Sequence, residues 1–184
     1  EKLARNLEQA LLQTQRAAGV IRDLRGFLAQ EASPDASTDV NAIARTVKQL
    51  LSIESDAAGV TVELALDESL GPCKAGRTPI EHVLINLMRN SLDAIREAKL
   101  SGGSIRVSTH AGKDSAEVTV ADNGPGLGGD AVQRAFDAFF STRPRGLGMG
   151  LSVCRSIVSS YGGKIWADPE LGTGAVFHFT LPLV

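Results

Sequence analysis

Residues Thr78–Glu97 read TPIEHVLINLMRNSLDAIRE, and their apolar side chains recur at the spacing of a helix. They fall on one face, which is typical of a helix packed against a protein core: Ile80, Val83, Leu84, Leu87, Met88, Leu92 and Ile95. The start of the helix is predicted by Thr78 as a capping hydroxyl, Pro79 at the first helical position and Glu81 as a reciprocal acidic cap. The stretch therefore predicts a central helix around which the rest of the domain packs.

The opposite face of this predicted helix carries Asn86, Asn90, Asp93 and Glu97. At about 100° of rotation per residue, these side chains form one narrow stripe. A solvated helix face usually carries long charged residues, whereas asparagine is a poor helix former. The stripe therefore predicts a functional site on this helix.

Composition limits the function classes that the chain can serve. With 184 residues, 43% of them apolar, the chain can form one cored domain plus an appendage. A formal net charge of −2 gives the chain no overall electrostatic attraction to nucleic acid or to an anionic membrane. No apolar run approaches the roughly 18 residues of a membrane span, and no signal peptide opens the chain. Cys73 and Cys154 lack metal-ligand spacing and predict ordinary thiols in a reducing, cytoplasmic compartment.

Residues 1–30 predict one long helix with a narrow apolar stripe. The stripe consists of Leu3, Leu7, Ala10, Leu11, Ala17, Val20, Ile21, Leu24, Phe27 and Leu28. Such a stripe is expected to pack on partner helices, and the alternative is a helix that lies on the following domain. The Ser-, Pro- and Asp-rich break EASPDASTD follows. We therefore expect a helix and linker at 1–34 and a separate domain at 35–184, together forming a piece of a longer protein.

The remaining sequence switches between helical and strand patterns. A helix is expected from about Asp39 to Ala58, with Thr38 as its cap and Gly59 as its stop. Further helices are expected at 131–136 and 151–161, and strands at 61–67, 104–111, 115–122, 164–170 and 175–183. Hairpins among these strands imply a mixed sheet with helices on one face, so we expect an α+β two-layer sandwich.

Two glycine-rich segments carry the strongest chemical signal. DNGPG at 122–126 ends a strand with a carboxylate and two glycines, where backbone turns sharply or approaches a ligand. GLGMGLS at 146–152 places glycines before a helix, whose free amides suit a phosphate. The segment between them is rich in Gly, Pro and Arg, as a mobile lid would be. The pattern is neither the dinucleotide fingerprint nor a P-loop, and the sequence contains no HRD or DFG motif of ordinary protein kinases.

Five motifs in this order resemble the N, G1, F, G2 and G3 boxes of the ATP-binding domain of bacterial sensor histidine kinases. They are NLMRNSLDA (86–94), DNGPG, FDAFFSTR (136–143), GLGMGLS and GTG (172–174). That domain belongs to the Bergerat-fold, or GHKL, superfamily with Hsp90, gyrase B and MutL, and the resemblance runs from about residue 38 to the end. RAAGVIRDLRGFL (16–28) resembles the second helix of the dimerisation and histidine-phosphotransfer hairpin. The boxes are most similar to those of kinases of the FixL and NtrB type.

The resemblance implies a site for ATP and Mg²⁺. Asp122 would accept a hydrogen bond from the adenine amine, where guanine presents an acceptor, and the alternative is a carboxylate that only caps the turn. Asn90 would bind Mg²⁺ through its amide oxygen, and Asn86 would lie beside the phosphates or a metal-bound water. Asp93 matches a position where the superfamily often has a carboxylate facing the nucleotide. Each of these three residues could otherwise be a solvated polar residue.

The resemblance also assigns the loops. Gly124 and Gly126 would permit the hinge of the lid, and the residues expected beside the nucleotide are Leu127, Gly146, Leu147, Gly148, Met149, Gly150 and Leu151. Arg143 and Arg145 are either phosphate contacts, with a catalytic role for Arg143, or exposed loop residues. The F-box aromatic residues would pack the lid against the domain: Phe136, Phe139 and Phe140. Thr180 would reach the adenine through a water or be an ordinary strand threonine.

Asn86 bears on the reaction type. In hydrolytic relatives the residue four before the metal-binding asparagine is a glutamate that activates water, and an amide cannot take a proton at neutral pH. The resemblance therefore implies phosphoryl transfer to a histidine, which this family carries on the first hairpin helix. His82, His110 and His178 all lie outside the first 30 residues. We expect the chain to bind Mg-ATP without phosphorylating itself and to phosphorylate a supplied hairpin.

Three function classes are compatible with these features. The first is the catalytic part of a two-component sensor kinase, homodimeric through its N-terminal helix, whose phosphohistidine feeds an aspartate on a response-regulator receiver domain. The second is an ATP hydrolase or conformational switch of the Hsp90 or MutL kind, which the amide at Asn86 disfavours. The third is a nucleotide-binding regulatory module without kinase activity, which the intact boxes disfavour. The parent protein could be soluble or membrane-anchored.

Overall fold

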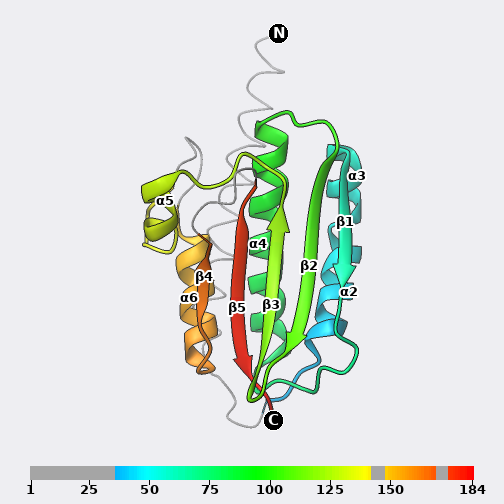
Figure 1. The fold of residues 1–184 in the computed structure, drawn as a ribbon, viewed down its shortest axis with the longest axis vertical. Helices are drawn as coiled ribbons and strands as arrows, with labels where there is room; N and C mark the ends of the chain where they lie inside the picture. Colours follow the sequence, from blue (N-terminus) through cyan, green and yellow to red (C-terminus); the bar gives the residue numbers. More distant parts are fainter. Residues whose placement is uncertain (1–35, 142–147, 169–173) are drawn as a thin grey trace, which may run out of the picture.

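The computed structural model describes residues 36–141, 148–168 and 174–184, which form a five-stranded sheet and the helices packed on it (Figure 1). The helix predicted for residues 1–30 and the boundary at residue 34 lie outside these ranges. No helix among the described residues is long and apolar enough to cross a membrane.

The sheet is mixed, as the hairpins predicted. Its strands are β1 (Val60–Ala65), β2 (Gly103–Ala111), β3 (Ser115–Asp122), β4 (Ile165–Ala167) and β5 (Val176–Pro182). They lie in the order β1-β2-β3-β5-β4. β1 runs parallel to β2, and the other neighbouring pairs are antiparallel. The 115–122 strand was predicted with the bounds that β3 has.

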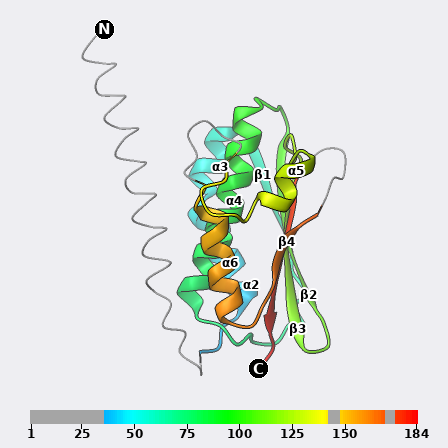
Figure 2. The ribbon, with the colours of Figure 1, turned by 90° about the vertical axis from the view of Figure 1, so that its left-hand side faces the viewer.

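Helices cover one face of this sheet. On this face lie α2 (Val40–Leu50), α3 (Ser52–Ala58), α4 (Arg77–Glu97) and α6 (Gly150–Ser160), and the short helix α5 (Gly129–Arg134) follows the turn after β3. Figure 2 shows α2, α3, α4 and α6 together on one side of the sheet, which confirms the α+β two-layer sandwich. Buried side chains alternate along the strands, with Phe177, Phe179 and Leu181 of β5 facing the core. The other face of the sheet carries mainly polar side chains.

The apolar face of α4 is confirmed, but the predicted cap is wrong. All the apolar positions named above are buried: Ile80, Val83, Leu84, Leu87, Met88, Leu92 and Ile95. The helix begins at Arg77 after Gly76, and no side chain caps it, so Thr78 lies inside the first turn. Glu81 lies 3.9 Å from the Arg77 guanidinium instead of closing a capping box. Proline is tolerated in this first turn because its missing N–H has no helical partner there.

The helix expected from Asp39 to Ala58 is two helices, because Leu51 leaves helical geometry at φ −90° and ψ 2° and is fully buried. Its cap is Asp39, whose carboxylate accepts a hydrogen bond from the Ala42 amide at 3.0 Å. Thr38 is instead extended and forms a backbone bridge with Cys73. Gly59, at φ +64°, ends α3 as predicted.

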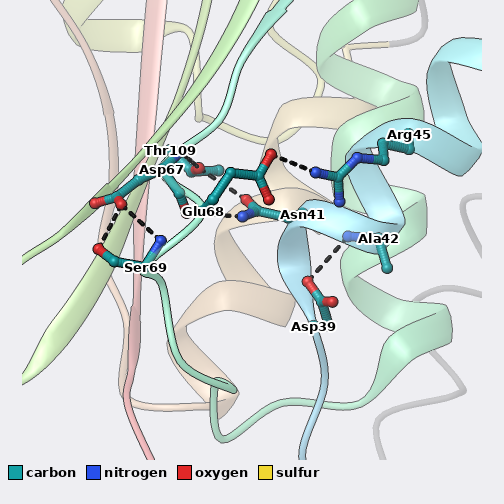
Figure 3. Close-up of polar contacts among 8 residues, drawn as sticks. All are labelled: Asp39, Asn41, Ala42, Arg45, Asp67, Glu68, Ser69 and Thr109. Carbon is teal, nitrogen blue, oxygen red and sulfur yellow. Dashed lines mark hydrogen bonds and ion pairs between the residues drawn. The ribbon is translucent and has the colours of Figure 1, made fainter.

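A buried polar network joins the first turn of α2 to the sheet (Figure 3). The Asn41 side chain donates to the Asp67 carbonyl at 2.8 Å and accepts from the Thr109 hydroxyl at 2.8 Å. The same hydroxyl accepts from the Asp67 amide at 2.9 Å. Buried polar groups persist when they are paired in this way. The network fixes the loop after β1 against both α2 and β2.

Asp67 makes the stability of this junction depend on pH. The Ser69 hydroxyl and the Ala111 and Ser69 amides hold the pKa of the Asp67 carboxyl below its usual value of 3.8. A depressed pKa in the folded state stabilises the fold above the unfolded-state pKa, and this contribution is lost as pH falls through the folded-state pKa. Asp67→Asn should therefore lower the free energy of unfolding at pH 7.

The test is urea unfolding of wild type and Asp67→Asn between pH 7 and pH 3, with the exposed Asp114→Asn as the matched control. The gap between wild type and Asp67→Asn should shrink as pH falls below about 4, because the wild-type carboxylate is then protonated as well. A gap that stays constant with pH would contradict the assignment.

Candidate nucleotide-binding site

Asp122 lies where three segments of the chain meet, at the end of β3. Its Oδ1 accepts hydrogen bonds from the Gly124 amide at 2.9 Å and from the Ala175 amide at 3.2 Å. Its Oδ2 accepts from the Ser91 hydroxyl of α4 at 2.7 Å. Asp122 is on the same side of β3 as the buried Val118 and Val120, so its carboxylate points into the helix layer.

Sequence reasoning missed Ser91. The serine is 1% exposed on the core side of α4, next to Asn90. A small polar residue within an apolar helix face was the available signal, because a buried hydroxyl needs a partner. The partner, Asp122, is 31 residues further along the chain.

Gly174 and Gly126 show how closely the backbone is packed around Asp122. A Cβ on Gly174 would lie 1.8 Å from the Asp122 carbonyl oxygen, and its φ is +99°. A Cβ on Gly126 would lie 2.8 Å from the Gly174 carbonyl oxygen. Both positions therefore need glycine, and the turn after β3 packs directly on Gly174, two residues before β5.

Gly174→Ala should consequently be strongly destabilising. The added methyl overlaps backbone that cannot rotate away, and the positive φ adds strain of about 1–3 kcal/mol. Gly128→Ala is the matched control, because a Cβ there has nothing within 4 Å. Urea unfolding should show a large loss for Gly174→Ala and little change for Gly128→Ala, and equal losses would contradict this packing.

The polar stripe of α4 faces the beginning of α6. Asn86 and Asn90 are half-buried, whereas Asp93 and Glu97 are exposed. A Cβ on Gly150 would lie 2.5 Å from the Asn86 Oδ1, so the first residue of α6 packs directly on this amide. The structure thus brings Asn86 and Gly150 together. Asn90 lies one helical turn further along α4, next to Ser91, whose hydroxyl donates to Asp122.

The N-terminus of α6 provides the amides that the sequence predicted. Met149 is its N-cap and no side chain caps the helix, so side chains leave its first amides available. Met149 and Leu151 are half-buried at this end, and Leu127, in the loop after the Asp122 turn, packs against the core. A helix N-terminus carries partial positive charge and favours an anion.

A hydrogen bond between backbone groups joins the two ends of the expected lid. The Phe139 amide donates to the Gly148 carbonyl at 2.9 Å. Gly148 has a φ of +66°, and a Cβ there would lie 2.5 Å from the Phe140 carbonyl oxygen. Arg143, Arg145, Gly146 and Leu147 lie between these ends and outside the described residues, so their expected contacts stay predictions.

The three F-box phenylalanines differ in environment. Phe136 is buried and meets Phe177 edge to face at 6.3 Å between ring centroids. Phe140 lies under the Arg134 guanidinium at 4.4 Å. Phe139 is 78% exposed with a φ of +66°, so the expectation that all three pack against the domain is wrong for Phe139.

Thr180 does not join the site. It pairs with Glu117 of β3, four positions from the Ala121–Val176 pair, which is about 13 Å along a strand. Its hydroxyl accepts a hydrogen bond from the Lys164 amide at 3.1 Å, on the sheet face opposite the helices. The expected adenine contact of Thr180 is therefore corrected. The start of β5 reaches Asp122 through the Ala175 amide instead.

Residues 75–184 match the family of histidine kinase-, DNA gyrase B- and HSP90-like ATPases, and the chain belongs to this family. Within it, the chain is similar in sequence and fold to the ATP-binding catalytic part of sensor histidine kinases. The resemblance of the five boxes is thereby confirmed.

Among its relatives is the sensor protein FixL of Bradyrhizobium diazoefficiens, 34% identical over 98% of this chain and 36% of that protein. The sensor protein DctS of Rhodobacter capsulatus is 32% identical over 98% of this chain and 28% of that protein. The chain thus spans about a third of the length of these relatives.

Solved structures agree with the fold. The catalytic domain of the histidine kinase ThkA superposes with a TM-score of 0.70 at 30% identity, covering 80% of this chain and 94% of that one. Full-length ShkA in complex with AMPPNP gives a TM-score of 0.77 at 25% identity, covering 98% of this chain and 39% of that one. ThkA is a histidine kinase, so the fold and the sequence lead to the same class.

Proposed function

We propose that this chain binds ATP with Mg²⁺ and transfers the γ-phosphoryl group to a histidine on a hairpin domain, for relay to a response-regulator aspartate. The observation that carries the proposal is the carboxylate of Asp122, which backbone amides and a buried serine hold at the end of β3. The remaining roles follow from the residues around it.

Asp122 selects adenine. Two backbone amides occupy its Oδ1, and Ser91 uses one acceptor site of Oδ2, so the second site of Oδ2 can accept the exocyclic amine of adenine. Guanine presents a carbonyl oxygen there, which would face the carboxylate without a hydrogen. Leaving a buried acceptor unpaired is costly, and this cost is the physical basis of the selection.

The donors on α4 fit Mg²⁺. Asn86 and Asn90 offer neutral amide oxygens on one helix face, and hard oxygen donors suit this ion. Among residues 36–141, 148–168 and 174–184, no cluster of three acidic, histidine or cysteine side chains could hold a metal alone. That donor set suits an ion shared with phosphate oxygens, for which Asn90 would be the protein ligand. When bound, the ion would neutralise phosphate charge and orient the γ-phosphoryl group.

The polyphosphate would lie at the N-terminus of α6. Gly150 lets the backbone approach closely there, as its contact with Asn86 shows. We assign Arg143 and Arg145 as cations that contact the phosphates, with Arg143 stabilising charge on the transferred group. Asp93, exposed one turn beyond Asn90, would face the nucleotide from the edge of the site.

Transfer is favoured over hydrolysis because Asn86 cannot remove a proton from water. None of the chain's histidines is proposed as the acceptor. His82 is half-buried on α4, and His110 is on the polar sheet face. His178 lies between Glu117 and Asp168, 3.0 Å from each carboxylate, and is stacked on Trp166. The acceptor would therefore come from a separate domain.

The relatives support the wider role. ThkA has been solved in complex with the response-regulator protein TrrA, and it superposes on this chain with a TM-score of 0.73 at 26% identity. We propose a receiver domain as the partner of this chain's parent protein as well. The apolar stripe of residues 1–30 supports a homodimer that forms through that segment. We also propose that the chain lies in the cytoplasm.

The decisive experiment combines binding and transfer. Calorimetry should show Mg-dependent binding of a non-hydrolysable ATP analogue. With γ-labelled ATP, the chain alone should gain no acid-labile, alkali-stable label, whereas an added hairpin domain carrying the acceptor histidine should. Rapid release of free phosphate would favour an ATPase, and failure to bind the analogue would sink the proposed function.

A further inference from the structure

The face of the sheet opposite the helices carries a cluster of titratable side chains outside the nucleotide site. Its centre is His178 of β5, whose side chain is only 14% exposed. The Nδ1 atom of this ring lies 3.0 Å from the Glu117 Oε1 on β3. Its Nε2 atom lies 3.0 Å from the Oδ2 of Asp168, the residue that follows β4. The imidazole ring therefore lies between two carboxylates that come from the two strands beside β5.

Both contacts of the ring are hydrogen bonds only when the ring is charged. A neutral imidazole has one N–H group and one acceptor nitrogen, so it can donate to only one of the two carboxylates. The other carboxylate then faces a nitrogen lone pair at 3.0 Å. The Thr119 hydroxyl, 3.1 Å from Nδ1, can donate to a neutral ring, but Glu117 then receives no hydrogen bond from that nitrogen. With both nitrogens protonated, the ring donates to Glu117 and Asp168 together.

Trp166 of β4 favours the same charged form. Its indole ring stacks on the His178 ring, with 5.0 Å between the ring centroids and 4° between the ring planes. The face of an indole attracts a cation, so this stack stabilises an imidazolium more than it stabilises a neutral imidazole. Because the ring is largely removed from water, the indole and the two carboxylates influence its charge more strongly than solvent does.

The neighbouring strands place further charged groups on this face of the sheet. Lys164 precedes β4, and His110 of β2 pairs with Glu117 across the β2–β3 ladder. Arg106 of β2 forms an ion pair with Glu63 of β1. Lys164, His110 and Arg106 are all exposed, so water and salt screen their charges. The two carboxylates in direct contact with the ring therefore dominate its electrostatic environment.

The ring joins segments that lie next to the Asp122 end of the sheet. β4 is an edge strand of three residues whose partner is β5. Asp168 directly follows this strand, and its amide donates to the Val176 carbonyl at 3.0 Å. Ala175, the residue before Val176, donates to the Asp122 carboxylate. A charged His178 thus adds a side-chain link between β3 and the end of β4, close to the backbone that holds Asp122.

We propose that Glu117, His178 and Asp168 form a proton-dependent clamp, which we name the His178 clamp. The charged ring joins Glu117 of β3 to Asp168 at the end of β4, and loss of its proton releases one of the two carboxylates. The clamp therefore holds β4, which precedes the G3 box, more firmly in mildly acidic than in basic solution. It needs no nucleotide, so its test does not depend on the proposed phosphoryl transfer.

Fluorescence reports the charge of the ring, because Trp166 is the only tryptophan of the chain. A charged imidazole stacked on an indole quenches its emission, so wild-type emission should fall from pH 8.5 to pH 5.5, a range that includes the ordinary histidine titration at about 6.5. His178→Gln should abolish this change, whereas His110→Gln, an exposed histidine beside Glu117, should keep it. Asp168→Asn should displace the change to lower pH, because it removes one charge that holds the proton and preserves the side-chain shape. Emission independent of pH in wild type, or a change that survives His178→Gln, would overturn the proposal.

Urea unfolding measures whether the clamp stabilises the fold. A proton that the folded state binds more tightly stabilises the fold fully below the pH at which an unfolded histidine titrates, about 6.5, and this stabilisation is lost as pH rises. The unfolding constant of His178→Gln relative to wild type should therefore be at least about fivefold larger at pH 5.5 than at pH 8.5. Glutamine is the chosen replacement because it donates to one carboxylate, as a neutral histidine does. For His110→Gln the same ratio should change by less than about twofold, because exposed ion pairs contribute little. A ratio for His178→Gln that is independent of pH would overturn the proposal.

Discussion

Asp122→Asn should weaken ATP binding roughly tenfold to a hundredfold while the protein stays folded. An asparagine can keep its oxygen at the Oδ1 position, where it still accepts from the Gly124 and Ala175 amides. Its NH₂ group then replaces Oδ2. The Ser91 hydroxyl can rotate to accept from it, but the adenine amine meets a second donor.

The same substitution should narrow the preference for adenine over guanine. The new NH₂ group can donate to the guanine carbonyl, so GTP affinity should fall less than ATP affinity or rise. Calorimetry with ATP and GTP analogues measures both, and urea unfolding checks the fold. Asp114→Asn, an exposed carboxylate in the β2–β3 turn, is the control. Unchanged ATP affinity in Asp122→Asn would contradict the proposal that Asp122 binds adenine.

Asn90→Ala should abolish Mg-ATP-dependent transfer to an added histidine hairpin, with a loss of at least about a hundredfold. The alanine removes the amide oxygen proposed to bind Mg²⁺ and adds no bulk. Folding should change little, because Asn90 is only half-buried. Transfer at the wild-type rate would mean that the α4 stripe is not the site described.

The side chain at position 86 is proposed to decide between phosphoryl transfer and ATP hydrolysis. Asn86→Glu would supply the base that hydrolytic relatives use, but the structure shows little room for it. A Cβ on Gly150 would already lie 2.5 Å from Asn86 Oδ1, so a longer side chain must displace the start of α6. Asn86→Asp is the better variant, because it adds a carboxylate at nearly the same volume. It should raise phosphate release from ATP, measured against Asn90→Ala as the inactive reference.

The turn after β3 shows which local features sequence reasoning can find. Asp122, Gly124 and Gly126 were found because a carboxylate and glycines in a row have a local signature. The structure places all three at the turn after β3. Asn86 was found because an asparagine in a helix is locally unfavourable, and it lies against Gly150.

Ser91 and Thr180 show where it fails. Ser91 and Asp122 are 31 residues apart, and nothing in either local sequence states that α4 and β3 meet there. Thr180 was assigned by its place in a motif, but the register of β5 on β3 carries it toward the far end of the strand. Contacts between distant segments depend on register and packing, which local patterns do not specify.

By itself the sequence determined the two-layer fold, the buried face of α4, the bounds of β3 and the glycine-containing turn that follows Asp122. It could do so because hydrophobic periodicity and glycine chemistry act within a few residues. Only the tertiary structure decided that Gly76 rather than Thr78 precedes α4, that Leu51 divides α2 from α3, and that Ser91 and the Ala175 amide hold Asp122. In each of these cases burial and hydrogen bonding between segments far apart in the chain outweigh the local preference of the sequence. Such contacts exist only in the packed fold.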